Sequence, residues 1–316
     1  MSNELKTKSK IKKKRGWSAT VKEMKKYRAI YAMMLLGAAC YIVFNYAPMY
    51  GIQIAFKDFY VTRGIWNSPW VGLKNFRELF ATGNFWRVFN NTLYLSVLRL
   101  IFGFPAPIIL ALLLNELRSE KYKRVIQTSI YLPHFISWVV IAGIINVIFA
   151  MDGPINAILK SVGINEVNFL TSSKTFRSMV VGSDIWKEVG WGTIIYLAAL
   201  TGISPDLYEA AYIDGASRWQ QTIKITIPCI LPTVSVLLIL KVGGLTDGGF
   251  DQIFNMYNEA VYDVGDIIQT YNYRVGLGQG NYARSTALSI FLNVINCVLL
   301  LSTNFVSKKL SGSGLY

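Results

Sequence analysis

The chain of 316 residues is 53% hydrophobic and only 16% charged, and its mean hydropathy of +0.36 is too high for a soluble domain of this length. Its net charge of +14 is compatible with a nucleic-acid partner. However, most basic residues flank apolar runs, and the basic N-terminal tail offers only Trp17 and Tyr27 for stacking on bases. The composition therefore counts against nucleic-acid binding and favours an integral membrane protein.

The chain begins with a basic tail, residues 1–28, which contains eleven Lys and Arg residues. Such a tail is a topology signal, and it can also touch anionic membrane lipid. The apolar run after it is long enough to span a bilayer and is not followed by a small-residue cleavage pattern. We therefore expect a retained first helix and not a cleaved signal peptide. Residues 29–316 are predicted to form one membrane domain.

Apolar runs then mark the expected membrane spans, each of which needs about 20 residues. Charge is absent from 29–56, 125–151 and 285–307, and 88–115 is interrupted only by Arg99. Two further runs, 178–201 and 225–246, are long enough but carry internal charges. The predicted fold is an all-α polytopic membrane protein with six transmembrane helices.

The distribution of basic residues sets the expected orientation. With the N-terminus inside, 19 Lys and Arg lie on the cytoplasmic side, against ten in three external loops and three within helices. This agrees with the positive-inside rule, so both termini are predicted to be cytoplasmic. The first external segment, 52–87, contains Phe76, Leu79 and Phe80 at the spacing of a short amphipathic helix. The external segment 250–284 is rich in Tyr, Asn and Gly, and its pattern does not place a helix.

Charged side chains inside predicted spans are costly and usually face a partner or a water-filled path. Lys187 lies three residues after Asp184, so the two side chains could pair along one helix face or line a pore. Trp186 and Trp191 are compatible both with stacking on a sugar ring and with anchoring at the membrane interface. The candidates for a substrate path are Arg99, Asp184, Lys187, Glu188, Trp191 and Lys241.

The sequence contains no motif typical of a catalytic site or a metal site. His134 is the only histidine, has no nucleophile or metal ligand spaced with it, and is expected to be structural. The three cysteines contain no CxxC pair. No GxxxxGK[ST] sequence occurs, so we expect the chain to bind no cofactor and to hydrolyse no nucleotide.

The cytoplasmic loop between the fourth and fifth expected spans, 204–228, carries strong local signals. Ser204 is a good N-cap, and Pro205 suits the first turn of a helix. Gly215 can adopt the left-handed conformation that ends a helix, and Pro228 is expected to limit the helix that follows. These signals predict two short helices joined by a sharp turn. They leave open whether the loop is a docking surface or a plain hairpin.

The same loop reads Glu209-Ala210-Ala211, three residues, Gly215, nine residues, and Ile225-Thr226-Ile227-Pro228. This pattern resembles the EAA loop of binding-protein-dependent ABC importer permeases, with Ile227 in place of the usual Leu. The resemblance extends from about Tyr46 to the C-terminus. The segments Val71 to Phe76, Tyr131 to His134 and Ser311 to Tyr316 are similar to the carbohydrate-uptake branch, in particular its polysaccharide-type permeases.

The resemblance implies a type I, maltose-permease-like subunit in a bacterial cytoplasmic membrane, forming half of an oligosaccharide pore. Its implied partners are a second related permease, two cytoplasmic ATPases that bind ATP and Mg, and an extracytoplasmic solute-binding protein. The residues it assigns to ATPase coupling are Glu209, Ala210, Ala211, Asp214, Gly215, Ile225 and Pro228.

The solute is less well determined than the architecture. In permeases of this type the substrate contacts come from the helices before and after the EAA loop, here the regions of 184–191 and Lys241. Because Lys187, Lys241 and Arg99 lie in spans where an apolar residue would insert more easily, we expect an oligosaccharide that carries negative charge. The alternative is that Asp184 and Glu188 neutralise Lys187, and that Lys241 pairs with Asp247 or extends to the membrane interface. Readings that stay open are a non-sugar solute, a membrane-embedded enzyme and a channel subunit.

Overall fold

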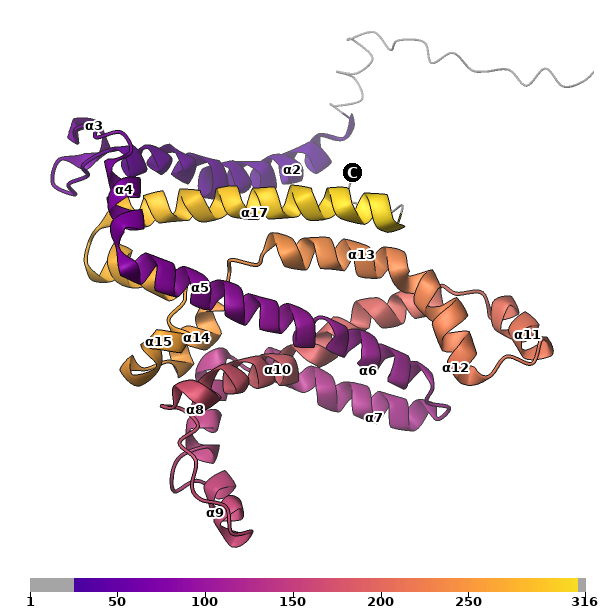
Figure 1. The fold of residues 1–316 in the computed structure, drawn as a ribbon. Coiled ribbons are helices and arrows are strands. Elements are labelled where there is room, and N and C mark those ends of the chain that lie inside the picture. Colours follow the sequence, from indigo (N-terminus) through magenta and orange to yellow (C-terminus); the bar gives the residue numbers. More distant parts are fainter. Residues whose placement is uncertain (1–25, 312–316) are drawn as a thin grey trace, which may run out of the picture. The chain divides into compact units, whose positions relative to one another are not determined.

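The computed structural model describes residues 26–311 and separates the chain into two units, Met1–Gln53 and Ile54–Tyr316. The described part is almost wholly helical. It contains no β-strand, and its only β-bridge joins Lys57 to Trp70. The all-α prediction is therefore confirmed (Figure 1).

In the first unit, helix α2, Arg28–Tyr41, continues into a π-helical turn, Ile42–Tyr46, and a 3-10 stretch, Ala47–Phe56, whose end belongs to the second unit. The whole run from Arg28 to Phe56 is long and apolar enough to cross a membrane. Large apolar side chains along α2 are exposed, including Met33 at 76%. Such exposure is the expected state of a helix that packs against lipid.

The second unit contains three further helical runs with the length and composition of a span, at Gly83–Asn115, Arg218–Gly243 and Tyr282–Lys309. The first comprises α5, Gly83–Leu98, a π-helical turn, Arg99–Gly103, and α6, Pro105–Asn115. The second comprises α12, Arg218–Gln221, a π-helical turn, Thr222–Thr226, and α13, Ile227–Gly243. The third is α17, Tyr282–Ser311.

The expected third span is not one straight helix. α7, Glu120–Tyr131, leads into a 3-10 turn, Leu132–Phe135, and α8, Trp138–Ile148, leaves at 101° to it. Pro133 lies in the turn, and Ser137 begins the new helix by accepting a hydrogen bond from the N–H of Val140. Apolar composition alone did not reveal this break, because the run 125–151 is free of charge on both sides of it.

The described residues thus hold four helices suited to crossing a membrane, or up to five if the bent α7–α8 pair counts as one span. Helix α10, Ser173–Thr201, is long enough at 29 residues but carries the internal charges noted above. The total of six spans stays a prediction.

Helix α10 occupies the centre of the second unit and packs against α6, α7 and α13. Near its beginning, Phe176 and Val180 are fully buried with Ile141 of α8 and Ile253 of α14, Phe250–Met256. Near its end, Tyr196 and Leu200 pack with residues of α6 and α13 in a separate cluster. α10 therefore connects two apolar cores and presents the residues between them, 184–191, at the junction.

A third core lies around the segment 52–87, which the sequence predicts to be external. Helices α3, Gly64–Asn67, and α4, Lys74–Ala81, occupy it, and the predicted amphipathic helix is α4. Its Leu79 is fully buried and Phe80 packs beside it, in a cluster that includes Phe85 of α5 and Leu288 of α17. The apolar face of α4 is therefore covered by protein.

The segment after α13, which the sequence did not resolve, is well structured. It contains α14, a 3-10 turn, Glu259–Val261, α15, Tyr262–Gly265, α16, Ile268–Tyr273, and a π-helical turn, Arg274–Gly278. Asp266 is fully buried, and Arg274 Nη2 donates to its Oδ2 at 2.6 Å. Burial alone would lower the pKa of Arg274, but the hydrogen bond and charge of Asp266 raise it, so the guanidinium stays charged.

Three of the π-helical turns precede a proline in the same way. The turns end at Tyr46, Gly103 and Thr226, and Pro48, Pro105 and Pro228 follow two residues later. In a regular α-helix the proline ring would clash with the carbonyl of the residue four positions earlier. In each of these three cases that carbonyl belongs to the wider π-helical turn. The helices therefore continue past these prolines, and the expectation that Pro228 limits the next helix was wrong.

Candidate functional site

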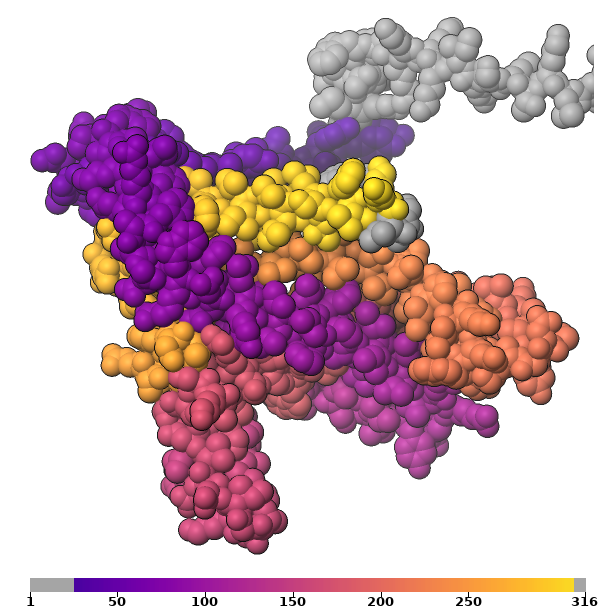
Figure 2. Space-filling model, in the orientation of Figure 1, coloured from indigo at the N-terminus to yellow at the C-terminus, as the bar shows by residue number. Residues whose placement is uncertain are grey.

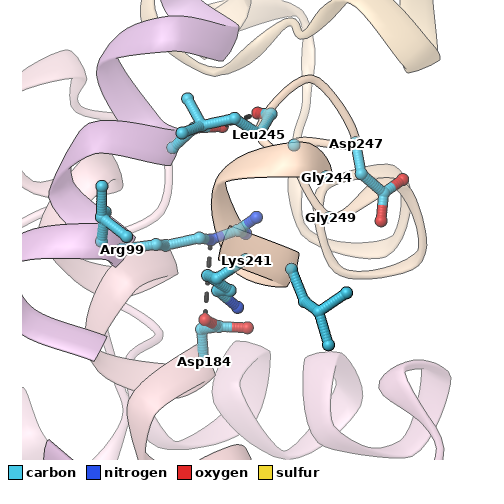
Figure 3. A pocket seen from close by; sticks show the side chains of 11 residues that line it. Arg99, Asp184, Lys241, Gly244, Leu245, Asp247 and Gly249 are labelled. Atoms are coloured by element: carbon cyan, nitrogen blue, oxygen red, sulfur yellow. Dashed lines mark hydrogen bonds and ion pairs between the residues drawn. The ribbon is translucent and has the colours of Figure 1, made fainter. Parts of the chain in front are cut away.

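Three elements surround a cavity of about 300 Å³, namely the end of α5, the middle of α10 and the end of α13 with the loop after it. Figure 3 shows Arg99, Asp184 and Lys241 converging on this cavity from the three helices. The loop contributes backbone and small side chains, and its residues on the cavity wall are Gly244, Leu245, Asp247, Gly248 and Gly249.

Arg99 is 7% exposed and is held in place by several polar partners. Its Nε lies 3.7 Å from Asp184 Oδ2, and its Nη2 donates to Gln252 Oε1. Gln252 in turn donates to the carbonyl of Val180 at 2.6 Å and to Ser183 Oγ at 2.8 Å. Ser96 donates to the carbonyl of Leu245 across the same space. The network ties α5, α10 and the post-α13 loop together.

A neighbouring cavity of about 530 Å³ shares Asp184, Leu240 and Lys241 with the first and extends along α6 and α10. Lys241 is exposed and forms no ion pair with any described residue, so the alternative pairing with Asp247 does not occur. The ammonium of Lys241 interacts with the charge of Asp184 beyond ion-pair distance and is directed at the cavity, so it is available to an anionic ligand.

Lys187 neither pairs with Asp184 nor lines either of these two cavities, although the sequence predicted one or the other. It is 6% exposed, lies outside the walls of both cavities, and donates to the carbonyls of Pro133 at 3.4 Å, Ile136 at 2.9 Å and His134. Its nearest carboxylate is Glu188 at 3.7 Å, not Asp184. The ammonium therefore satisfies the open carbonyls of the α7–α8 break.

The two candidate tryptophans of α10 are separated by the structure. Trp191 is 45% exposed on the wall of the larger charged cavity, whereas Trp186 borders a different, almost wholly apolar cavity with Ile144 and Phe149. Glu188 also lies on the wall of the charged cavity, and its Oε2 is 2.8 Å from His134 Nδ1. Of the six residues predicted for a substrate path, all except Lys187 border one or both charged cavities.

The first helix and the sharp turn of the loop 204–228 are as predicted, whereas the second helix is not short, because α12 continues through the π-helical turn into α13. Ser204 Oγ accepts from the N–H of Asp206, α11 runs Pro205–Ile213, and Gly215 adopts a φ of +76°. Ser217 and Gln220 then form a capping box that starts α12. The two helices lie at one projecting end of the second unit (Figure 2), away from the α14–α15 segment (Figure 1).

Apolar side chains are exposed on this end, in particular Tyr212 at 78%, Ile213 at 84% and Trp219 at 72%. Glu209, Ala210, Asp214 and Gly215 are exposed as well, while Ala211 is half-buried. Tyr208 Oη lies 2.9 Å from Thr226 Oγ1, which links α11 to the π-helical turn before α13. A displacement of α11 would therefore act directly on a spanning helix.

Among residues 26–311, no group of three His, Cys, Asp or Glu side chains lies close enough together to hold a metal ion.

The family model described as "Binding-protein-dependent transport system inner membrane component" matches residues 103–312, which include the two charged cavities' α10 and α13 walls and the whole loop 204–228. The chain belongs to this family. The permease is 44% identical to Protein LplB of Bacillus subtilis (strain 168), covering 95% of this chain and 94% of LplB. It is 43% identical to the polygalacturonan/rhamnogalacturonan transport system permease protein YteP of the same organism, over 91% and 90% of the two chains.

Solved structures support the same architecture. The permease is 42% identical to a chain in the crystal structure of a bacterial ABC transporter involved in the import of the acidic polysaccharide alginate, with a TM-score of 0.86 over 92% of this chain and 99% of that chain. A second structure, of the alginate transporter in complex with an alginate pentasaccharide-bound periplasmic protein, gives 41% identity and the same TM-score over 93% and 99% of the chains. The permease architecture is thereby confirmed.

Sequence reasoning missed two contributors to the site. Gln252 anchors Arg99, although a neutral amide outside the predicted spans gives no signal in a search for intramembrane charge. His134 was expected to be structural, and its partner was the part that the sequence did not indicate: its ring packs face to face on Trp191, with centroids 4.4 Å apart and planes 2° apart. Pro133 within the apolar run 125–151 was the available signal, because proline indicates a break in a helix.

Proposed function

We propose that this permease forms half of the translocation pore of an ATP-driven importer of acidic oligosaccharides. The complex comprises this chain, a second related permease, two cytoplasmic ABC ATPases that bind ATP and Mg, and an extracytoplasmic binding protein. Both termini of the chain lie on the cytoplasmic side, which the positive-inside distribution supports.

Coupling is assigned to the loop 204–228. Its capped helix, its exposed Leu207, Tyr212 and Ile213, and the small side chains of Ala210 and Ala211 together make a surface suited to a groove on an ATPase. The link from Tyr208 to Thr226 carries movement of that surface into the helix that bears Lys241. ATP binding by the ATPases thus biases a two-state arrangement of the pore helices.

The unpaired ammonium of Lys241 is the observation that carries the acidity of the solute. Arg99 is paired with Asp184, and Glu188 is near Lys187, so these four charges balance within the protein. Lys241 and Asp247 remain without an ion pair among the described residues. Lys241 lies on α13 within the span, where a carboxylate-bearing sugar offsets the cost of its charge. The anionic polysaccharides in the names of YteP and of the alginate transporter support this choice.

Uptake by the complete transporter in proteoliposomes tests the proposal. The probes are an oligogalacturonate and a neutral malto-oligosaccharide of equal length, each presented with the binding protein. Lys241→Gln is expected to lower oligogalacturonate uptake about tenfold or more, the value of a charge-assisted hydrogen bond of about 1.5–3 kcal/mol. Asp247→Asn, which neutralises the other unpaired charge of the cavity, serves as the matched control and should not lower it.

Two results would contradict the proposal. If Lys241→Gln left uptake of the acidic probe unchanged, Lys241 would have no role in solute charge. If the wild-type transporter imported the neutral probe and not the acidic one, the solute class itself would be wrong.

A further inference from the structure

The break between α7 and α8 places His134 and Phe135 against Trp191 and Glu188, two residues on the wall of the larger charged cavity. The ring of His134 lies face to face with Trp191, and Phe135 meets the same indole edge-on at 5.7 Å. Glu188 Oε2 lies 2.8 Å from His134 Nδ1. Lys187 holds the backbone of the break through its carbonyls. The indole of Trp191 is therefore fixed from behind and at its edge.

The Trp191 side chain is also accessible from the larger cavity. Among the described residues only His134 and Phe135 make ring contacts with Trp191, while the side chain is 45% exposed and borders the cavity of about 530 Å³. An indole ring that is supported by a stacked neighbour and lies near carboxylates is suited to binding a pyranose ring. The ring C–H groups of the sugar pack on the indole face, and its hydroxyl groups donate to a carboxylate.

Glu188 supplies that carboxylate, because its side chain is 41% exposed on the same wall. Lys241 borders the cavity as well. A sugar ring stacked on Trp191 thus has an acceptor for its hydroxyl groups and, on α13, a donor for a carboxylate substituent. The cavity volume of about 530 Å³ is within the range of small-molecule sites.

We infer that Trp191 is a sugar-stacking platform within the translocation path, that Glu188 accepts hydroxyl hydrogens beside it, and that His134 is the positioning residue that sets the plane of the indole. This inference rests on the proposed function and names the part of the site that receives the sugar ring. His134 acts through Trp191 and does not itself border the cavity.

The test measures uptake of a fluorescent oligogalacturonate and of an alginate oligosaccharide by the complete transporter in proteoliposomes, per folded complex and over a range of loaded binding protein. Trp191→Ala is expected to lower the maximal rate about tenfold without changing the KM for the loaded binding protein, since an aromatic contact is worth up to about a tenfold effect. Trp191→Phe keeps a ring and should stay within about threefold of wild type. Trp186→Ala removes a tryptophan of the same helix from a different cavity, and uptake should not change.

A double-mutant cycle separates positioning from general stabilisation. His134→Ala should lower the maximal rate about threefold, His134→Phe should restore most of it by keeping the stack, and His134→Ala in the Trp191→Ala background should add nothing. Independent, additive losses would assign His134 a purely structural role and overturn the positioning claim.

Different results would overturn the stacking role of Trp191 and the proposed import of acidic oligosaccharides. Wild-type uptake of neither acidic probe would overturn the proposed function. Wild-type uptake that Trp191→Ala leaves intact would overturn the platform alone.

Discussion

Gly190 marks the closest approach of α10 to α7. A Cβ built at this position would lie 1.9 Å from the carbonyl oxygen of Ile130 and 2.5 Å from its carbonyl carbon, both atoms of the α7 backbone. A carbon normally stays about 3.3 Å or more from such an oxygen, so Gly190→Ala requires a separation of the helices on the order of 1 Å. Overpacking of this kind costs about 1–3 kcal/mol.

Gly182, two turns earlier on α10, provides the matched control because nothing lies within 4 Å of its Cβ position. There Ala gains helix propensity of about 1 kcal/mol without a clash. The gain in helix propensity is common to both substitutions, so their unfolding free energies should differ by the overpacking cost alone, about 1–3 kcal/mol. Thermal unfolding of the purified transporter in detergent, together with its abundance in the membrane, measures the difference. Equal stability of Gly190→Ala and Gly182→Ala would refute the tight α7–α10 contact.

Three further substitutions address the break, the buried pair and the coupling loop. Lys187→Met strips three carbonyls of the α7–α8 break of their donor, so the thermal stability of the transporter should fall by about 3 kcal/mol or more; a fall below about 1 kcal/mol would contradict the clamp. Asp266→Asn leaves Arg274 without its counter-charge and should cost about 3–5 kcal/mol, seen as faster proteolysis of the segment after α13, whereas unchanged proteolysis would argue against the pair. Gly215→Val strains a φ of +76° and should abolish co-purification of the ATPase while the chain still reaches the membrane. As a control, Gly163→Val imposes the same strain at a φ of +80° in another loop and should retain the ATPase. Equal behaviour of the two variants would contradict the assignment of the loop to ATPase docking.

Local chemistry explains which features were predictable from sequence. The N-cap at Ser204, the left-handed Gly215 and the amphipathic α4 depend on residues within a few positions of one another, and the structure contains all three. The charged residues of α10 and α13 were also identified as candidates, because lipid makes an intramembrane charge conspicuous.

Partners chosen by tertiary packing were not predictable in the same way. Whether Lys187 pairs with Asp184 three residues away or with carbonyls more than fifty residues away depends on where α7 breaks. The role of His134 likewise depends on Glu188, 54 residues later in the chain. The absence of charge from 125–151 gave no information about the break, since uncharged residues lie on both sides of Pro133.

The π-helical turn Thr222–Thr226 has a consequence for the communication between the two ends of its helix. A turn of this kind holds one residue more than regular α-helix, so it advances the helical phase by about 100°. The angle between the directions of Trp219 and Lys241 around the helix axis therefore differs from the value that 3.6 residues per turn would give. Deleting one residue from the turn would keep both halves helical but rotate the coupling end about the helix axis relative to the cavity, leaving each surface intact and their mutual orientation wrong.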